Sequence, residues 1–240
     1  MPPGKNASRL PIVIKRPPKS LVELVAGRID PAARRRARLV MRRLLRAYPD
    51  ARVMLNFRDP WELMVATILA AQCTDAKVNE VTPALFKEFG TPRKMAGANL
   101  RTLQRLIRPT GFFRMKAKSV KGASRAIVER FGGGVPDTMA DLLTLPGLGR
   151  KTANVILGNV FGKAEGVVVD THNIRLSNLL GFVDTKDPVQ IERFWTAALD
   201  RKDWTMCGHV LYAHGQRVCI ARRPRHDDCV VRDLCPAAGL

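Results

Sequence analysis

The chain has 240 residues with 41 Lys and Arg against 21 Asp and Glu, which gives a formal net charge of +20 at pH 7. Its 46% hydrophobic and 26% charged residues are typical of a globular protein and exclude wholesale disorder, collagen and coiled coils. No stretch approaches the ~20 consecutive apolar residues that a membrane-spanning helix needs. The charge favours a polyanionic partner, and nucleic acid is the first candidate.

The positive charge is concentrated near the N-terminus, where residues 1–52 contain 14 Lys and Arg and three acidic residues. Residues 1–30 form a basic, proline-rich extension in which no acidic residue precedes Glu23. This composition predicts a flexible tail. A mitochondrial presequence is the alternative, but the prolines oppose the amphipathic helix that it requires. No secretory signal is recognisable, so we expect a reducing, cytoplasmic environment.

Apolar periodicity predicts one helix after another in the rest of the chain, and therefore an all-α fold. Asp30 and Pro31 are an N-cap and a first-turn proline, and the helix that they open continues over 34–48. Its polar face carries arginines that are either solvated or bound to phosphates: Arg35, Arg38, Arg42 and Arg46. Further helices are expected at 61–72, 77–89, 99–107, 115–130, 138–144, 150–161, 171–180, 188–200 and 204–214. The valines at 167–169 are too few for a sheet.

A Gly-x-Gly turn lies between two predicted helices, in the segment LPGLGRKTAN at 145–154. Gly147 and Gly149 permit a tight turn that presents backbone N–H groups at the start of the next helix, where anions bind. Gly-x-Gly alone also fits a plain turn between helices. Arg150 and Lys151, directly after it, and the basic charge of the chain favour a phosphate site.

The segment LPGLGRKTAN, the later Val169-Asp170-Thr171-His172 and the clustered C-terminal cysteines together resemble the helix-hairpin-helix (HhH-GPD) DNA glycosylases, in particular the bacterial endonuclease III branch. The resemblance extends from about residue 35 to 236 and leaves out the N-terminal extension. It implies a two-lobed all-α fold with DNA in the cleft between the lobes. One lobe would be residues 53–163, with the hairpin, and the other residues 31–52 and 164–240.

The resemblance also implies a base excision repair enzyme that removes oxidised pyrimidines from duplex DNA and cleaves the strand at the abasic (AP) site. Lys151 matches the family's catalytic lysine, which attacks C1′, expels the base and leaves a Schiff base that undergoes β-elimination. Asp170 matches the aspartate that assists the lysine and stabilises positive charge on the sugar. A simple phosphate contact is the alternative for Lys151, and Asp170 is also predicted as a helix N-cap.

Enzymes of this class flip the damaged nucleotide out of the duplex. By the same resemblance, Gln72 fills the vacated space and Phe112 is the wedge against the orphaned partner base, where the bacterial enzymes have an aliphatic residue. A core position is the alternative for Phe112. Asp75 and His172 match pocket residues. The other predicted DNA contacts are Leu145, Gly147, Gly149 and Arg150 in the hairpin and Arg222, Arg223 and Arg225 near the C-terminus.

The C-terminal cysteines resemble the family pattern Cys-x6-Cys-x2-Cys-x5-Cys, which holds a [4Fe-4S] cluster. Cys219, Cys229 and Cys235 occupy the first, third and fourth positions, and His226 occupies the second with the spacing intact. We expect a [4Fe-4S] cluster with Cys3His ligation. Structural zinc, or no metal with buried cysteines, are the alternatives. The other Cys and His considered lack ligand spacing and are interpreted as core or helix-face residues: Cys73, Cys207, His209 and His214.

Two other functions fit parts of the pattern. An adenine-mismatch glycosylase, which is monofunctional, is disfavoured by Lys151, because that branch lacks a nucleophilic amine at this position. A non-catalytic helix-hairpin-helix DNA-binding protein would use the hairpin for phosphate contacts only. We expect a monomer, associated with the bacterial nucleoid and not with a membrane, whose partner is duplex DNA with a damaged base or an abasic site.

Overall fold

The computed structural model describes residues 29–238. The predicted basic extension therefore lies outside the described residues except for its last two positions. The elements are α1 (Pro31–Ala47), α2 (Pro60–Leu69), α3 (Asp75–Glu88), α4 (Pro92–Ala96), α5 (Leu100–Ile107), η2 (Arg108–Thr110), α6 (Phe113–Arg130), α7 (Met139–Leu143), α8 (Arg150–Val160), α9 (Thr171–Leu179), α10 (Pro188–Ala198), η3 (Arg201–Asp203), α11 (Trp204–Arg217), η4 (His226–Asp228) and η5 (Arg232–Leu234).

The predicted all-α class is confirmed, since no residue in 29–238 belongs to a strand. The predicted helix starts at the two Asp-Pro pairs are confirmed as well. Asp30 Oδ2 accepts from Ala33 N at 2.8 Å, and Asp59 Oδ1 accepts from Glu62 N at 2.8 Å. The sequence missed α4, because five residues are too few to display a helical period. The helix predicted at 61–72 ends earlier, at Leu69.

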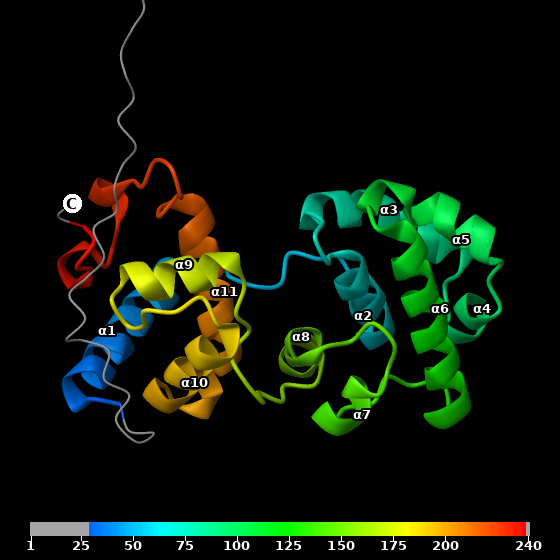
Figure 1. The fold of residues 1–240 in the computed structure, drawn as a ribbon, viewed down its shortest axis with the longest axis horizontal. Coiled ribbons are helices and arrows are strands. Elements are labelled where there is room, and N and C mark those ends of the chain that lie inside the picture. Colours follow the sequence, from blue (N-terminus) through cyan, green and yellow to red (C-terminus); the bar gives the residue numbers. More distant parts are fainter. Residues whose placement is uncertain (1–28, 239–240) are drawn as a thin grey trace, which may run out of the picture.

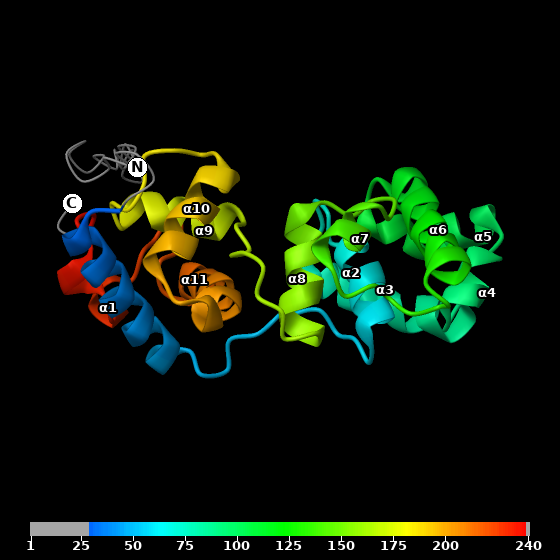
Figure 2. The same cartoon turned by 90° about the horizontal axis from the view of Figure 1, so that it is seen from below.

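Buried hydrophobic residues form two separate clusters, which define two lobes. The hairpin lobe is the cluster between Leu55 and Leu157, built from α2 to α8. The terminal lobe is the cluster of residues 37–51 and 167–231, built from α1, α9, α10, α11 and the segment after α11. From residue 29 on, the chain thus runs from the terminal lobe to the hairpin lobe and back. Helix α8 lies at the side of the hairpin lobe that faces α9 to α11 (Figures 1 and 2). The predicted domain boundaries stay a prediction.

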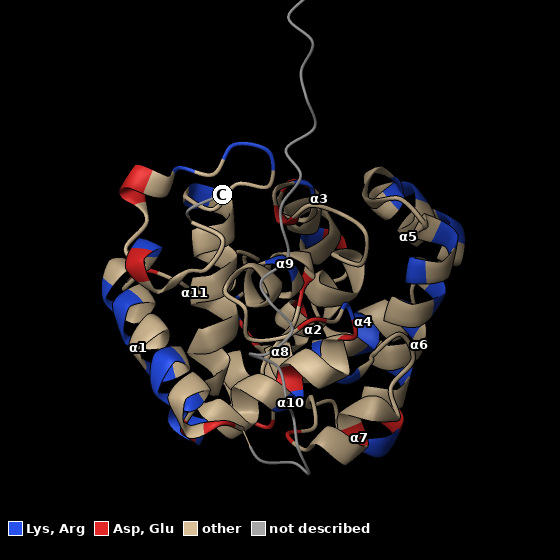
Figure 3. Cartoon of the chain, turned by 60° about the vertical axis from the view of Figure 1, so that its left-hand side comes forward, with Lys and Arg blue, Asp and Glu red and all other residues tan. Residues whose placement is uncertain are grey.

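Positive charge is distributed over both lobes. Figure 3 shows Lys and Arg gathered along α1, along α5 and α6, and on the segment after α11. The predicted arginine face of α1 is exposed, and Arg38 in it pairs with Asp200 at 2.8 Å. Whether this face contacts phosphates stays a prediction. Within residues 29–238 no helix is both long enough and apolar enough to cross a membrane.

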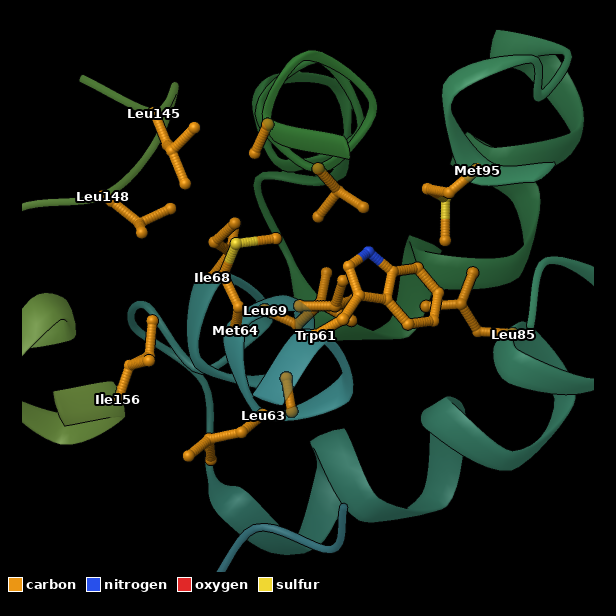
Figure 4. Close-up of a cluster of buried hydrophobic side chains, with 14 of the residues drawn as sticks. Trp61, Leu63, Met64, Ile68, Leu69, Leu85, Met95, Leu145, Leu148 and Ile156 are labelled. Carbon is orange, nitrogen blue, oxygen red and sulfur yellow. The ribbon is translucent and has the colours of Figure 1, made fainter. Parts of the chain in front are cut away.

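The core of the hairpin lobe supports the hairpin directly. Trp61 is buried at its centre, where its Nε1 donates to Ser124 Oγ at 3.3 Å. Leu145, which precedes the predicted phosphate turn, and Leu148, which lies between its two glycines, are among the buried side chains together with Ile68 (Figure 4). The apolar residues of the LPGLGRK segment therefore anchor the turn in the core, while its glycines stay outside it.

Polar contacts join the two lobes along α8. Arg150 donates to Glu192 of α10 through Nε at 3.2 Å and Nη2 at 3.0 Å, a two-point ion pair. Asn154 Nδ2 donates to the same carboxylate at 3.3 Å, and Glu192 is only 9% exposed. Farther along α8, His209 Nε2 lies 2.8 Å from Asn159 Oδ1. The helix that carries Lys151 is thus fastened to the terminal lobe.

Candidate active site

Three of the predicted site residues lie at helix starts that meet between the lobes. Asp75 is the first residue of α3, Lys151 is the second residue of α8, and Asp170 is the N-cap of α9. Burial raises the pKa of the Asp75 carboxyl, the hydrogen bond from Tyr212 and the charge of Lys151 lower it, and Asp170 raises it again. The lysine and both carboxylates therefore share one electrostatic environment.

Asp170 is held rigidly by its capping role. Its Oδ1 accepts from Asn173 N at 2.8 Å, which confirms the predicted N-cap. Asn173 is buried, and its Nδ2 donates to Val168 O at 2.5 Å. The residue that Asp170 caps is therefore itself held by a second hydrogen bond. The half-buried carboxylate at the positive end of α9 is thereby kept in one orientation toward the space between the lobes.

Tyr212 of α11 is a site residue that the sequence did not reveal. Its hydroxyl donates to Asp75 Oδ2 at 3.4 Å and accepts from Gln216 Nε2 at 2.6 Å. Burial, followed by the charges of Asp75 and Asp170, raises the pKa of Tyr212 to about 12, so the hydroxyl stays protonated. Its ring packs edge-on against the predicted pocket residue His172, with ring centroids 5.1 Å apart. A lone tyrosine inside a helix carries no local sequence signal for such a role.

Lys151 and its neighbour Arg150 face different surroundings. Lys151 is exposed and forms no ion pair with any residue in 29–238. Arg150, by contrast, is engaged by Glu192, and this contact raises the pKa of its guanidinium. The predicted DNA contact of Arg150 stays a prediction, and its visible role is to bind the lobes together.

The two glycines of the hairpin turn differ in backbone conformation and in the space around them. Gly147 has φ of +82°, and a Cβ there would lie 2.6 Å from Ser119 Cβ. Gly149 is the N-cap of α8 with an extended backbone, and a Cβ there would meet no atom within 4 Å. No side chain caps this helix start, so its first N–H groups lack a side-chain acceptor. Leu145 is buried, which leaves only its main chain for the predicted DNA contact.

Gln72 and Phe112 share an unusual backbone conformation. Their φ angles are +52° and +44°, and within residues 29–238 they are the non-glycine residues with positive φ. Such a conformation is strained for a side-chain-bearing residue and is found preferentially at functional sites. Phe112 is 67% exposed, so the alternative of a core position is wrong. Met115, three residues further on, is 71% exposed, which the sequence analysis overlooked.

The four predicted metal ligands surround a single cavity. It has a volume of about 440 Å³, and Cys219, His226, Cys229 and Cys235 all line it. Burial raises the pKa of each of the three thiols, and the cysteines act on one another electrostatically. Within residues 29–238 no group of three or more His, Cys, Asp or Glu side chains is assembled around the position of a single metal ion.

His214 was interpreted as a core or helix-face residue, and it is buried next to this cavity. Burial lowers its pKa to about 4, so the imidazole is neutral at pH 7. Tyr48 Oη lies 2.8 Å from Nδ1, and Cys229 Sγ lies 3.5 Å from Nε2. The tautomer with its proton on Nε2 satisfies both neighbours. Cys207 is fully buried in the core, as predicted.

The three arginines predicted to contact DNA from the C-terminal segment are all exposed. Arg225 pairs with Asp228, with Nε to Oδ2 at 2.6 Å. Arg222 and Arg223 have no ion-pair partner in the described part of the chain, which leaves their guanidinium groups accessible. Their DNA-binding role stays a prediction.

Comparisons with known proteins define the family. Residues 65–199 match the HhH-GPD superfamily base excision DNA repair proteins, and residues 219–235 match the iron-sulfur binding domain of endonuclease III. Endonuclease III of Synechocystis sp. is 47% identical over 206 residues, which cover 85% of this chain and 94% of that protein. Endonuclease III of Escherichia coli is 36% identical over 196 residues, which cover 82% and 92%.

Solved structures agree with this assignment. A non-covalent endonuclease III–DNA complex superposes with a TM-score of 0.81 at 33% identity, over 86% of this chain and 96% of that chain. A thermostable thymine-DNA glycosylase, at 19% identity and a TM-score of 0.75, shares the fold. The chain belongs to the HhH-GPD superfamily of base excision DNA repair proteins and, within it, to the endonuclease III family. It is a DNA glycosylase with AP lyase activity and has an iron-sulfur binding domain.

The two glycines of the hairpin are expected to respond differently to substitution. Gly147→Ala should lower the free energy of unfolding by about 2–3 kcal/mol, because it combines a left-handed backbone with a clash against Ser119. Gly149→Ala should stay within about 1 kcal/mol of the wild type. Urea unfolding followed by circular dichroism measures both. Equal losses for the two variants would contradict the described turn.

Proposed function

We propose that Lys151 is the nucleophile that removes oxidised pyrimidines from duplex DNA. Its amine attacks C1′ of the flipped nucleotide, the bond between C1′ and the base breaks, and the base departs. The sugar ring then opens as the bond between C1′ and O4′ breaks and the amine gives up a proton, which leaves a Schiff base between Lys151 Nζ and C1′. Removal of a proton from C2′ then expels the 3′ phosphate by β-elimination. The observation that carries this proposal is the shared environment of Lys151, Asp75 and Asp170 at three converging helix starts.

The surroundings of the lysine support this chemistry. A lysine is an unreactive ammonium at its free pKa near ~10.4, so its amine needs positive potential and a proton acceptor. The uncapped start of α8 supplies positive potential at Lys151. We assign to Asp170, which is fixed by its capping bond, the removal of the ammonium proton and then the stabilisation of the positive charge that develops on the sugar.

Asp75 and Tyr212 have a different part in this proposal. Burial raises the pKa of Asp75, and the Tyr212 hydroxyl, which stays protonated, donates to it. The phenol holds the carboxyl through Oδ2, and the other carboxyl oxygen can accept a hydrogen bond from the edge of a flipped base. We assign them to base recognition, with His172 packed against the Tyr212 ring as support.

The two strained turns are proposed to open the duplex. Gln72 and Phe112 project exposed side chains from left-handed backbone, which rigidly directs them away from the core. An inserted side chain unstacks a base step, and an amide can pair with the bases that remain. Lys and Arg along α5 lie on the same lobe as Phe112 and are suited to phosphate contacts. The protein would act as a monomer on DNA with a damaged base or an abasic site.

Replacing the lysine separates catalysis from binding. Lys151→Ala and Lys151→Arg should both abolish strand cleavage of a duplex with one thymine glycol. Lys151→Arg keeps the charge but has no nucleophilic amine, so it should bind that duplex as the wild type does. Lys151→Ala should weaken binding by no more than about tenfold, the effect of one phosphate contact. Gel shift and gel-based cleavage assays measure the two properties. Cleavage by either variant would exclude Lys151 as the nucleophile.

We further propose that Cys219, His226, Cys229 and Cys235 hold a [4Fe-4S] cluster. The residues fit this group, because three thiols and one imidazole surround a cavity of about 440 Å³ between them. Mutual proximity of three half-buried thiols is unfavourable for thiolates unless metal compensates their charge. When bound, the cluster supplies a redox centre whose potential histidine ligation raises. The loop between Cys219 and His226 carries Arg222 and Arg223 and would be fixed by it.

Substitutions of His226 test this ligand set. The wild type should contain about four irons per chain, as a [4Fe-4S] cluster requires. His226→Cys should keep that iron and lower the reduction potential, because thiolate replaces imidazole. His226→Ala should lose iron, whereas Arg223→Ala, an exposed neighbour, should not. Metal analysis of purified protein and protein-film voltammetry measure these outcomes. Zinc in place of iron, or full iron in His226→Ala, would refute the assignment.

A further inference from the structure

Lys116 is a buried cation between the two strained turns. It lies in the first turn of α6 and is 5% exposed. Its Nζ donates to Leu69 O at 2.8 Å and to Thr110 O at 2.7 Å. A lysine is rarely buried, and these two hydrogen bonds replace bonds that its ammonium would form with water.

Both acceptors are the last carbonyls of helical segments. Leu69 ends α2, and Thr110 ends η2. Carbonyls at helix ends lack a partner within the helix and carry partial negative charge, so an ammonium is a favourable ligand for them. One side chain thus joins the ends of two segments that are 41 residues apart in the chain.

In the chain, the two carbonyls come shortly before the two residues with left-handed backbone. Gln72 follows Leu69 by three residues, and Phe112 follows Thr110 by two. Burial lowers the pKa of the Lys116 ammonium, and the neighbourhood of Cys73, next to Gln72, opposes this effect, so Lys116 lies close to the Gln72 turn. The ammonium therefore lies beneath both turns. No other side chain in the described part of the chain hydrogen-bonds to the carbonyls of both Leu69 and Thr110.

We propose that Lys116 is a positioning residue that locks the Gln72 turn and the Phe112 turn at a fixed separation, so that both side chains enter the duplex together. This inference rests on the proposed function of those two residues. Each turn has a short backbone hydrogen bond of its own, from Cys73 N to Ala70 O at 3.1 Å and from Gly111 N to Arg108 O at 3.3 Å, but neither bond links one turn to the other. Each turn also holds a residue in a strained conformation. Without the ammonium, the two carbonyls would be left without this donor and the turns could shift independently. A change of about 1 Å in the distance between the two turns is enough to impair a preorganised site.

The helix α6 offers a matched control. Lys121 also donates from Nζ to a main-chain carbonyl, that of Ala98 at 2.5 Å. This bond does not involve either turn. Lys121→Met therefore removes one lysine-to-carbonyl contact on the same helix and should leave duplex opening unchanged.

The test compares two substrates for Lys116→Met, which keeps the length of the side chain and removes its charge. The first is a duplex with one thymine glycol opposite 2-aminopurine, whose fluorescence reports unstacking. The second is a single-stranded oligonucleotide with an abasic site, which has no partner base to displace. With the duplex, Lys116→Met should lose the fluorescence change and cleave at least tenfold more slowly in single turnover. With the single strand, it should stay within twofold of the wild type. Lys121→Met should match the wild type on both.

A double-mutant cycle makes the test specific for positioning. In a Gln72→Ala, Phe112→Ala background, Lys116→Met should cause no further loss on the duplex, because Lys116 acts through those two side chains. An unchanged duplex rate for Lys116→Met, an additive loss in that background, or an equal loss on both substrates would overturn the proposal. Failure of the proposed function of Gln72 and Phe112 gives a different result, since the Gln72→Ala, Phe112→Ala variant would then open and cleave the duplex as the wild type does.

Discussion

The buried carboxylate of Glu192 holds the two halves of the site in register. It accepts two bonds from Arg150 and one from Asn154, both on α8, and a Cβ at Gly166 would lie 1.9 Å from its Oε1. Lys151 adjoins Arg150, and Gly166 precedes Asp170 by four residues in the connection between the lobes. One carboxylate from α10 therefore holds the helix that carries the proposed nucleophile, and it packs closely against the segment that leads to the aspartate. Because it is buried, its bonds are little screened by solvent.

Helix termini position most of the other proposed site residues. Asp75, Lys151 and Asp170 all lie at helix starts, where the local potential is positive and the orientation of each side chain is restricted. The C-terminal ends of α2 and η2 have the opposite polarity and present carbonyls, which accept hydrogen bonds from Lys116. Helix N-termini thus surround the proposed reaction centre, and the C-terminal ends of helical segments lie beneath the turns that are proposed to insert into DNA. The hairpin lobe supplies a rigid base for both, since Leu145 and Leu148 anchor the hairpin in its core.

Local signals in the sequence predicted the parts of the fold that depend on neighbouring residues. Asp30-Pro31 marked the start of α1, and Asp170 was recognised as a cap before a helix, because capping is a contact over three residues. The early end of α2 was missed because nothing in its apolar pattern reveals that Gln72 adopts a left-handed conformation. Contacts across the chain, such as Tyr212 with Asp75, 137 residues apart, leave no local trace. The resemblance to a known family named the candidate residues, and the structure supplied the partners that hold them.

Borohydride trapping tests the central claim, a Schiff base on Lys151, most directly. The purified chain is incubated with a duplex that carries one thymine glycol, the mixture is reduced, and the covalent protein–DNA adduct is digested and mapped by mass spectrometry. A Schiff base on Lys151 gives an adduct whose modified peptide contains Lys151. An adduct at another lysine would contradict the assignment of the nucleophile. The absence of an adduct with both this duplex and abasic DNA would contradict the proposed lyase mechanism.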